Sequence, residues 1–176
     1  MEKKSAGRLY PGASAMNKLQ KQFEESCKRS FQFLMDEYGC QIVQSGEHAA
    51  GSVMLYTNST TGIKVSLEPR ENFIFVYLIQ LQDGKIPAYL DAPDHWVYFD
   101  AVLALKNPKL KVQQKAFGDW LTPKDIDTIL ANYAHTLRIY GWEVLIGDFM
   151  LFKAIRGRIM SPSAGTQVAE NAAQRI

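Results

Sequence analysis

The sequence has little cysteine and no metal-binding motif. Cys27 and Cys40 are the only two cysteines among 176 residues, and neither belongs to a CxxC pair or has a histidine partner at the spacing of zinc ligands. We therefore expect no metal and no cofactor. Isolated cysteines of this kind are typically small buried residues in a reducing compartment, so we expect two buried, free thiols.

The common signatures of catalysis are also missing. The chain has no Gly-rich dinucleotide or triphosphate loop, no GxSxG nucleophile elbow and no HExxH zinc motif. This pattern favours a protein that binds a partner over one that catalyses a reaction.

Long hydrophobic runs and a strong net charge are absent too. The most apolar run, residues 73–81, is about half the length of a membrane-spanning helix. The charged N-terminal residues 1–12 are not followed by the apolar stretch of a secretory signal. A net charge of +2 does not by itself indicate a nucleic-acid or membrane partner. These features predict a cytoplasmic protein without a membrane partner.

The composition and length of the chain suit one folded domain. Hydrophobic residues make up 47% and charged residues 22% of the chain, and its length is typical of a single domain. Residues 1–13 and 161–176 are small and polar without periodicity, so we expect both ends to be disordered. The predicted domain spans residues 14–160.

The first half of that domain changes its period from 3.6 to 2. Apolar residues at steps of three and four predict a long helix that Ser14 caps and Gly39 ends. Alternating residues then predict strands at 40–45, 52–58, 63–68 and 73–82, joined by tight turns into a β-meander. Because Pro87 interrupts residues 85–90, that segment predicts at most a short edge strand.

Helical signals return in the second half. Asp94 is expected to cap a helix that stops at Asn107, and Thr122 with Asp125 forms a capping box before a helix that Gly141 ends. Residues 142–156 predict a last helical layer with Trp142 toward the core and Asp148 as a cap. The predicted fold class is α+β, an antiparallel four- to five-stranded meander preceded by one long helix and followed by three helices.

The loop before the second set of helices carries the first candidate surface. Aromatic side chains beside acids suit interface anchors, so we expect a protein-binding surface there. The same loop permits a small enzyme in which Asp91, Asp94 and His95 share a proton, although capping and turn formation explain both aspartates. A metal would need a third protein ligand, which the sequence does not nominate. The candidate residues are Tyr89, Asp91, Asp94, His95 and Trp96.

A lysine-rich stretch gives a second candidate. It contains no acid and is followed by Phe117 and Trp120, a combination that holds phosphates and stacks bases in single-stranded nucleic acid. The alternatives are a short edge strand at residues 109–112 whose outward lysines prevent aggregation, and lysines that are simply solvated. The lysines are Lys106, Lys109, Lys111 and Lys115.

The strand at residues 73–81 is apolar on both faces. Such a strand is either covered by layers on both sides or offers one face to a partner, so a homodimer stays open.

The segments 31–34, 53–58, 63–68 and the GDFxxF element formed by Gly147, Asp148, Phe149 and Phe152 resemble a set of short uncharacterised bacterial α+β proteins. The resemblance covers residues 31–158. Some small proteins of this type are similar to immunity or inhibitor proteins, which act by binding a partner. It implies a non-enzymatic, immunity-like binding protein and carries over no catalytic residue.

Overall fold

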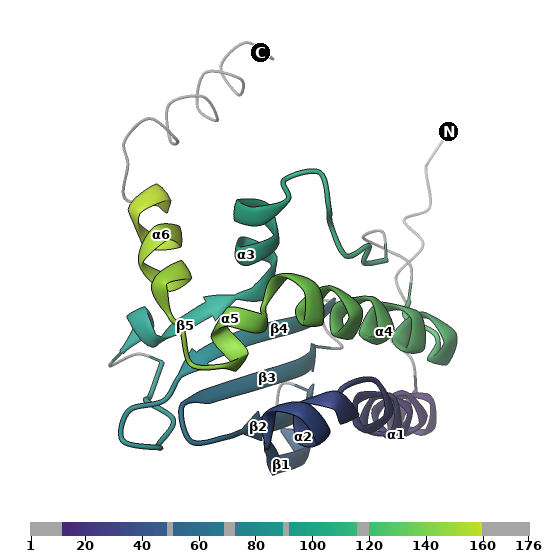
Figure 1. Ribbon diagram of the computed structural model, residues 1–176. Helices are drawn as coiled ribbons and strands as arrows, with labels where there is room; N and C mark the ends of the chain where they lie inside the picture. The colour runs from purple at the N-terminus through teal and green to yellow at the C-terminus, as the bar shows by residue number, and fades with distance from the viewer. Residues whose placement is uncertain (1–11, 49–50, 69–72, 90–91, 116–119, 160–176) are drawn as a thin grey trace.

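A single antiparallel sheet with helices packed against it forms the protein in the computed structural model (Figure 1). The structure describes residues 12–48, 51–68, 73–89, 92–115 and 120–159. The predicted α+β class is confirmed. The segments expected to be disordered lie outside the described residues, except for residues 12 and 13, where Ala13 begins the first helix.

The predicted N-terminal helix is interrupted once. It comprises α1 (Ala13–Ser30) and α2 (Gln32–Tyr38), separated at Phe31, whose φ of −100° and ψ of 14° leave helical geometry. Ser14 does not cap it, because the helix begins one residue earlier behind Gly12 and has no side-chain cap. The predicted end is confirmed: Gly39 has a left-handed φ of 65°, which costs glycine little.

Five strands follow in chain order and form the predicted meander: β1 (Gln41–His48), β2 (Gly51–Thr57), β3 (Thr61–Glu68), β4 (Phe73–Gln80) and β5 (Trp96–Tyr98). The fifth strand is not where the sequence suggested. Residues 85–89 form no strand, and Gln82 and Lys85 make only an isolated bridge. Instead β5 pairs with residues 77–79 of β4, so the first half of β4 has no strand on its outer side among the described residues.

The helix expected after Asp94 begins later. Residues Pro93–His95 form one 3-10 turn, and α3 (Phe99–Lys106) starts after the strand with Tyr98 in the cap position. The prediction that Asp94 caps this helix is therefore wrong, because pairing with β4 holds the intervening residues in an extended conformation.

The capping box before α4 (Pro123–Tyr140) is confirmed: the Asp125 amide donates to Thr122 Oγ1 over 3.3 Å, and the Thr122 amide donates to Asp125 Oδ2 over 2.9 Å.

Helices α1 and α4 lie side by side and cover one face of the sheet (Figure 1). The hydrophobic core lies between these layers, because every second residue of β2, β3 and β4 points toward the helices. Its largest fully buried side chains include Phe23, Phe31, Tyr56, Phe99, Tyr133 and Phe152.

The C-terminal stretch forms two helices where one layer was expected, α5 (Trp142–Leu145) and α6 (Met150–Ile159). Gly147, with φ of 89°, lies between them. Leu145 and Phe152 enter the core as predicted, but Trp142 does not, since 46% of it is exposed.

Asp148 takes the structural role that the sequence indicated. Its Oδ1 accepts a hydrogen bond of 2.9 Å from the amide of Met150, the first residue of α6. We expect Asp148→Ala to lower the free energy of unfolding by about 1 kcal/mol, measured by urea denaturation. Asp148→Asn keeps the acceptor and should retain most of that stability. Equal losses in the two variants would contradict the capping role.

Candidate functional site

The second face of the sheet carries aromatic side chains. In β4 the residues that alternate with the core point to this face, and β5 adds to it because Tyr98 pairs with Tyr77 and Trp96 with Ile79. The small apolar cluster on this face contains no residue of a described helix. We call the set the aromatic face: Phe73, Phe75, Tyr77, Tyr89, Trp96 and Tyr98.

The rings of the aromatic face touch one another in sequence along β4 and β5. Ring centroids lie 5.7 Å apart for Phe73 and Phe75 and 6.1 Å apart for Phe75 and Tyr98. Tyr77 and Tyr98 approach to 4.5 Å, and their hydroxyls are 3.1 Å apart. These separations are typical of attractive aromatic pairs, so the rings support one another in fixed positions.

The predicted loop residues Tyr89 and Trp96 extend this array. Their centroids are 5.8 Å apart in an edge-to-face arrangement, and Trp96 lies 6.1 Å from Tyr77. Trp96 Nε1 donates to the Pro87 carbonyl over 3.0 Å, which fixes the indole against the loop. Tyr89 and Tyr98 remain 50% and 44% exposed, so the array is open to solvent at both of these rings.

A cation from β3 lies over two of the rings. The Lys64 ammonium group, from neighbouring β3, is 5.3 Å from the Tyr77 centroid and 5.9 Å from the Trp96 centroid. Lys64 forms no ion pair with any residue that the structure describes. Burial and the hydrogen bond with Tyr98 raise the pKa of Tyr77, so its phenol stays neutral beside the ammonium group.

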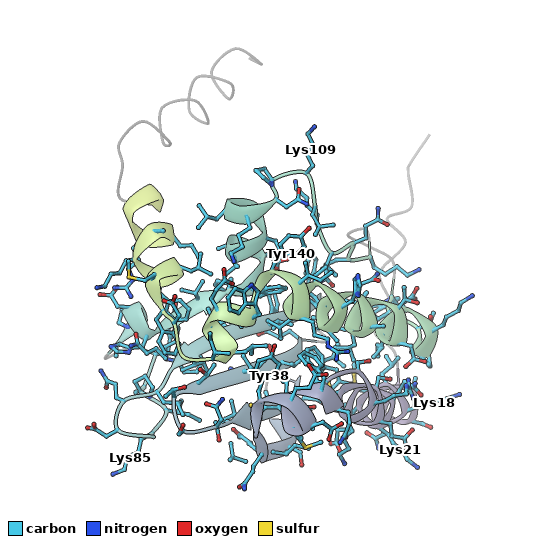
Figure 2. The ribbon with its side chains drawn as sticks, viewed as in Figure 1. Lys18, Lys21, Tyr38, Lys85, Lys109 and Tyr140 are labelled. Atoms are coloured by element: carbon cyan, nitrogen blue, oxygen red, sulfur yellow. The ribbon has the colours of Figure 1, made fainter. Side chains whose placement is uncertain are left out.

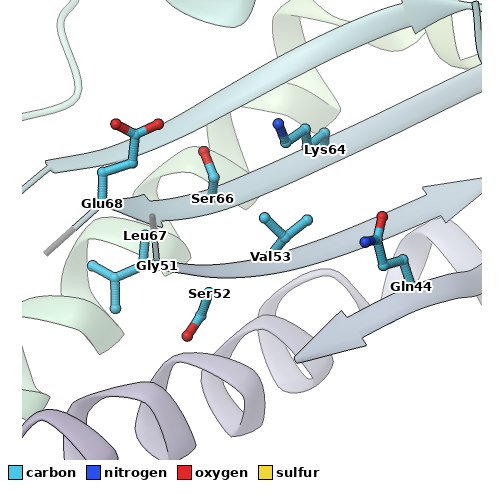
Figure 3. Close-up of a pocket in the computed structure, with 8 residues that line it drawn as sticks. All are labelled: Gln44, Gly51, Ser52, Val53, Lys64, Ser66, Leu67 and Glu68. Carbon is cyan, nitrogen blue, oxygen red and sulfur yellow. The ribbon is translucent and has the colours of Figure 1, made fainter. Parts of the chain in front are cut away.

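A hollow of about 240 Å³ continues the same face across β2 and β3 (Figure 3). Lys64, Ser66 and Glu68 follow one another along β3 and point to the same side, while Val53 contributes from β2. Ser66 is only 3% exposed, and its Oγ has no hydrogen-bond partner in the described part of the chain. The open face thus combines an aromatic half with a small, polar-lined depression.

The two described residues of the proposed enzyme site contact partners in different parts of the chain. Asp94 Oδ2 pairs with Arg156 of α6 at 3.2 Å, whereas His95 Nε2 lies 3.0 Å from Gln82 Nε2. No contact joins Asp94 to His95 among the described interactions, and Asp91 lies outside the described residues. The structure therefore brings Tyr89 and Trp96 together but does not join the described acid to the imidazole.

No metal centre forms within the described ranges, since no group of three or more His, Cys, Asp or Glu side chains is arranged to hold an ion there. The cysteines are buried and free, as expected. Burial raises the pKa of Cys27 well above its ordinary value and that of Cys40 to about 11, so both remain protonated thiols at neutral pH.

Two lysines of the lysine-rich stretch form ion pairs, and the other two are exposed. Lys106 pairs with Glu143, and Lys115 pairs with Asp125 at 3.4 Å. Lys109 and Lys111 are exposed, and Lys109 extends away from the molecule (Figure 2). The alternative of an edge strand at residues 109–112 is wrong, because this segment is irregular. Phe117 lies outside the described residues.

The sequence patterns did not identify Lys64, which lies within the strand predicted at residues 63–68. Tyr98 counts among the aromatic residues that suit an interface anchor, but the patterns place it in a helix rather than in β5. The signal that finds Lys64 is strand register, because its partner across β3 and β4 is Tyr77. Finding Tyr98 requires the pairing of β5, which no local pattern gives.

Comparison with known proteins yields no relative: no protein-family model matches the chain, and no curated protein or solved structure is significantly similar to it. Among the described helices, none has the length and apolar character needed to cross a membrane.

Proposed function

We propose that this chain is a non-enzymatic, cytoplasmic binding protein whose aromatic face docks a protein partner. The observation that carries the proposal is a continuous set of mutually supporting rings on a sheet face with no described helix over it, with Tyr89 and Tyr98 about half exposed. Tyrosine and tryptophan dominate binding energy at interfaces, because they bury a large area at a low cost in entropy.

The charge on this face narrows the chemistry of the partner. Lys64 has no ion pair with a described residue and lies beside apolar rings, where water is partly excluded. A partner acid placed over it would form an ion pair in a region of reduced dielectric. We therefore infer that the partner presents apolar side chains and at least one carboxylate to this face.

The resemblance of the GDFxxF element to immunity-like bacterial proteins supports an inhibitory role, in which docking blocks a bacterial partner. Two further occupants are outcomes of the experiment below: a second copy of this chain, and single-stranded nucleic acid. The small-enzyme alternative would need Asp91, Asp94 and His95 to face one pocket, whereas Asp94 and His95 each contact other residues.

We expect Tyr98→Ala and Tyr89→Ala to weaken partner binding by at least tenfold each, because both remove an exposed anchor ring. The partner is first captured by the wild-type chain from the native host and then purified for calorimetric titration. Trp142→Ala is the matched control, since Trp142 is equally exposed but belongs to α5, outside the aromatic face. Unchanged affinity in both tyrosine variants, with melting temperatures as in the wild type, would overturn the proposal.

Two parallel measurements separate the other occupants. A mass that doubles in wild-type light scattering and returns to the monomer in Tyr98→Ala would identify a homodimer. Binding of single-stranded oligonucleotides that falls steeply with salt and disappears in a Lys109→Ala, Lys111→Ala double variant would favour nucleic acid. We expect neither result.

A further inference from the structure

A second cavity lies at the half of β4 that β5 leaves unpaired. Its volume is about 280 Å³, and it opens between β4, α3 and the irregular segment that follows α3. Most of its lining is apolar, including Phe75, Leu103, Leu110 and Val112. A pocket of this kind excludes water from the body of a small ligand.

One end of the cavity is polar and tightly ordered. Gln114 takes the place of a paired strand: its Nε2 donates to the Ile74 carbonyl over 2.7 Å, and the Ile74 amide donates to its Oε1 over 3.3 Å. The other hydrogen of Nε2 is donated to the Tyr133 hydroxyl over 3.0 Å. The Tyr133 hydroxyl in turn donates to Asp100 Oδ2 over 3.0 Å.

The polar end of the cavity has free hydrogen-bond acceptors but no free side-chain donor on Gln114 or Tyr133. Both Gln114 amide hydrogens and the single Tyr133 hydrogen are already used, so neither side chain has a donor left. Asp100 has only acceptors, and the hydroxyl occupies one of several lone pairs. It forms no ion pair with a described residue. The polar end therefore requires a ligand that donates hydrogen bonds, and the negative charge favours a cation.

We propose that this cavity binds a small molecule with an apolar body and a primary ammonium head, with the head received by Asp100 and the body packed against Phe75, Leu103 and Leu110. Asp100 lines the cavity and is exposed, so the head can enter from solvent. Lys111 also lines the cavity, but its side chain is exposed, which lets the ammonium group of Lys111 move into water.

The protonation state of Asp100 should make the affinity for an amine depend on pH. Burial raises its pKa above the ordinary value, and the hydrogen bond from Tyr133 partly opposes that rise. The titratable groups that line the cavity with it are Lys111 and Tyr133 of α4, and burial raises the pKa of the Tyr133 phenol. Affinity for an amine should therefore fall as the pH drops through the raised pKa of Asp100.

The test uses three probes of one shape: phenethylamine, 2-phenylethanol and phenylacetate. We expect the amine to bind most tightly and the carboxylate least, measured by NMR titration of residues around Leu103. Asp100→Asn still accepts from Tyr133 but loses the charge, so it should weaken amine binding about tenfold and leave the alcohol nearly unchanged. Asp83→Asn, an exposed acid in the turn after β4, is the matched control and should bind as the wild type does.

A blocking variant separates loss of the site from loss of the fold. Ala104 is exposed and lines the cavity from α3, so Ala104→Trp should fill the opening and abolish binding of all three probes at an unchanged melting temperature. The proposal is overturned if no probe binds at millimolar concentration, if phenylacetate binds as tightly as the amine, or if Asp100→Asn and the wild type bind the amine equally. The cavity shares Phe75 with the aromatic face, but none of these outcomes depends on a protein partner.

Discussion

Phe152→Ala is expected to lower the free energy of unfolding by about 3–5 kcal/mol. Phe152 is fully buried in the main core, although it lies in the last described helix, and its ring stands 5.3 Å from that of Phe149. Alanine would remove the ring and leave a cavity that rigid neighbours in the core, including those on α3, close only in part. Since a domain is typically stable by only 5–15 kcal/mol, this single change should remove a large fraction of the total.

Urea denaturation followed by circular dichroism measures the effect, and Met150→Ala is the matched control. Met150 belongs to the same helix but is 67% exposed, so its replacement should change stability by less than about 0.5 kcal/mol. Similar small losses in the two variants would show that α6 does not close the core. The GDFxxF element would then need an explanation other than packing.

Replacing Asn58 with alanine should cost about 2–3 kcal/mol, because one side chain serves two structures. Its Oδ1 accepts from the amides of Thr60 and Thr61 at 2.9 and 2.8 Å, which builds the turn between β2 and β3. Its Nδ2 donates to the carbonyl of Tyr38 at 3.2 Å and to that of Leu145 at 3.4 Å. The residue thus joins this turn to the ends of α2 and α5.

Asn58→Asp separates the two roles. A carboxylate keeps both acceptor bonds but cannot donate, and it places a charge against two carbonyl oxygens. The variant should therefore keep the turn but lose both bonds to the ends of α2 and α5, so its free energy of unfolding should lie below that of the wild type. Ser59→Ala, at an exposed position of the same turn, is the control for both changes. An unchanged free energy of unfolding in Asn58→Asp would exclude the donor role.

Elements with complete local signals were predictable. The capping box of Thr122 and Asp125 lies within four residues and fixes the start of α4 without help from the rest of the chain. Alternation in β3 likewise gave both the strand and the side that faces the core, because the period of two is a property of the backbone. The turn between β2 and β3 also followed from the residues that join these strands, whereas residues 49–50 and 69–72 lie outside the described part of the chain.

The conformation of short segments depended on residues that lie far away in the sequence. Residues 96–98 fit a helix or a strand equally well by pattern, and pairing with residues 77–79 of β4 made them a strand. That pairing also moved the start of α3 and removed the capping role of Asp94. Trp142 was expected in the core because apolar spacing implied a longer helix, whereas α5 ends after four residues.

The candidate site also has a part that was predictable from the sequence and a part that was not. Tyr89 and Trp96 were predicted as anchors from composition, and the structure places their rings in contact. The contribution of Lys64 and Tyr98, and the pairing of Lys106 with Glu143, depend on residues that lie far apart in the sequence. The cavity at Asp100 had no sequence signal, because its polar end joins side chains from three separate segments.

The sequence by itself determined the α+β class, the order of the meander, the helix ends with strong caps and the aromatic character of β4. These properties follow from backbone periods and from contacts within about one helical turn. The tertiary structure decided which apolar face stays open, which lysines are neutralised and where a cavity remains. Those outcomes depend on pairing and packing between distant segments, whose free energies no local pattern records.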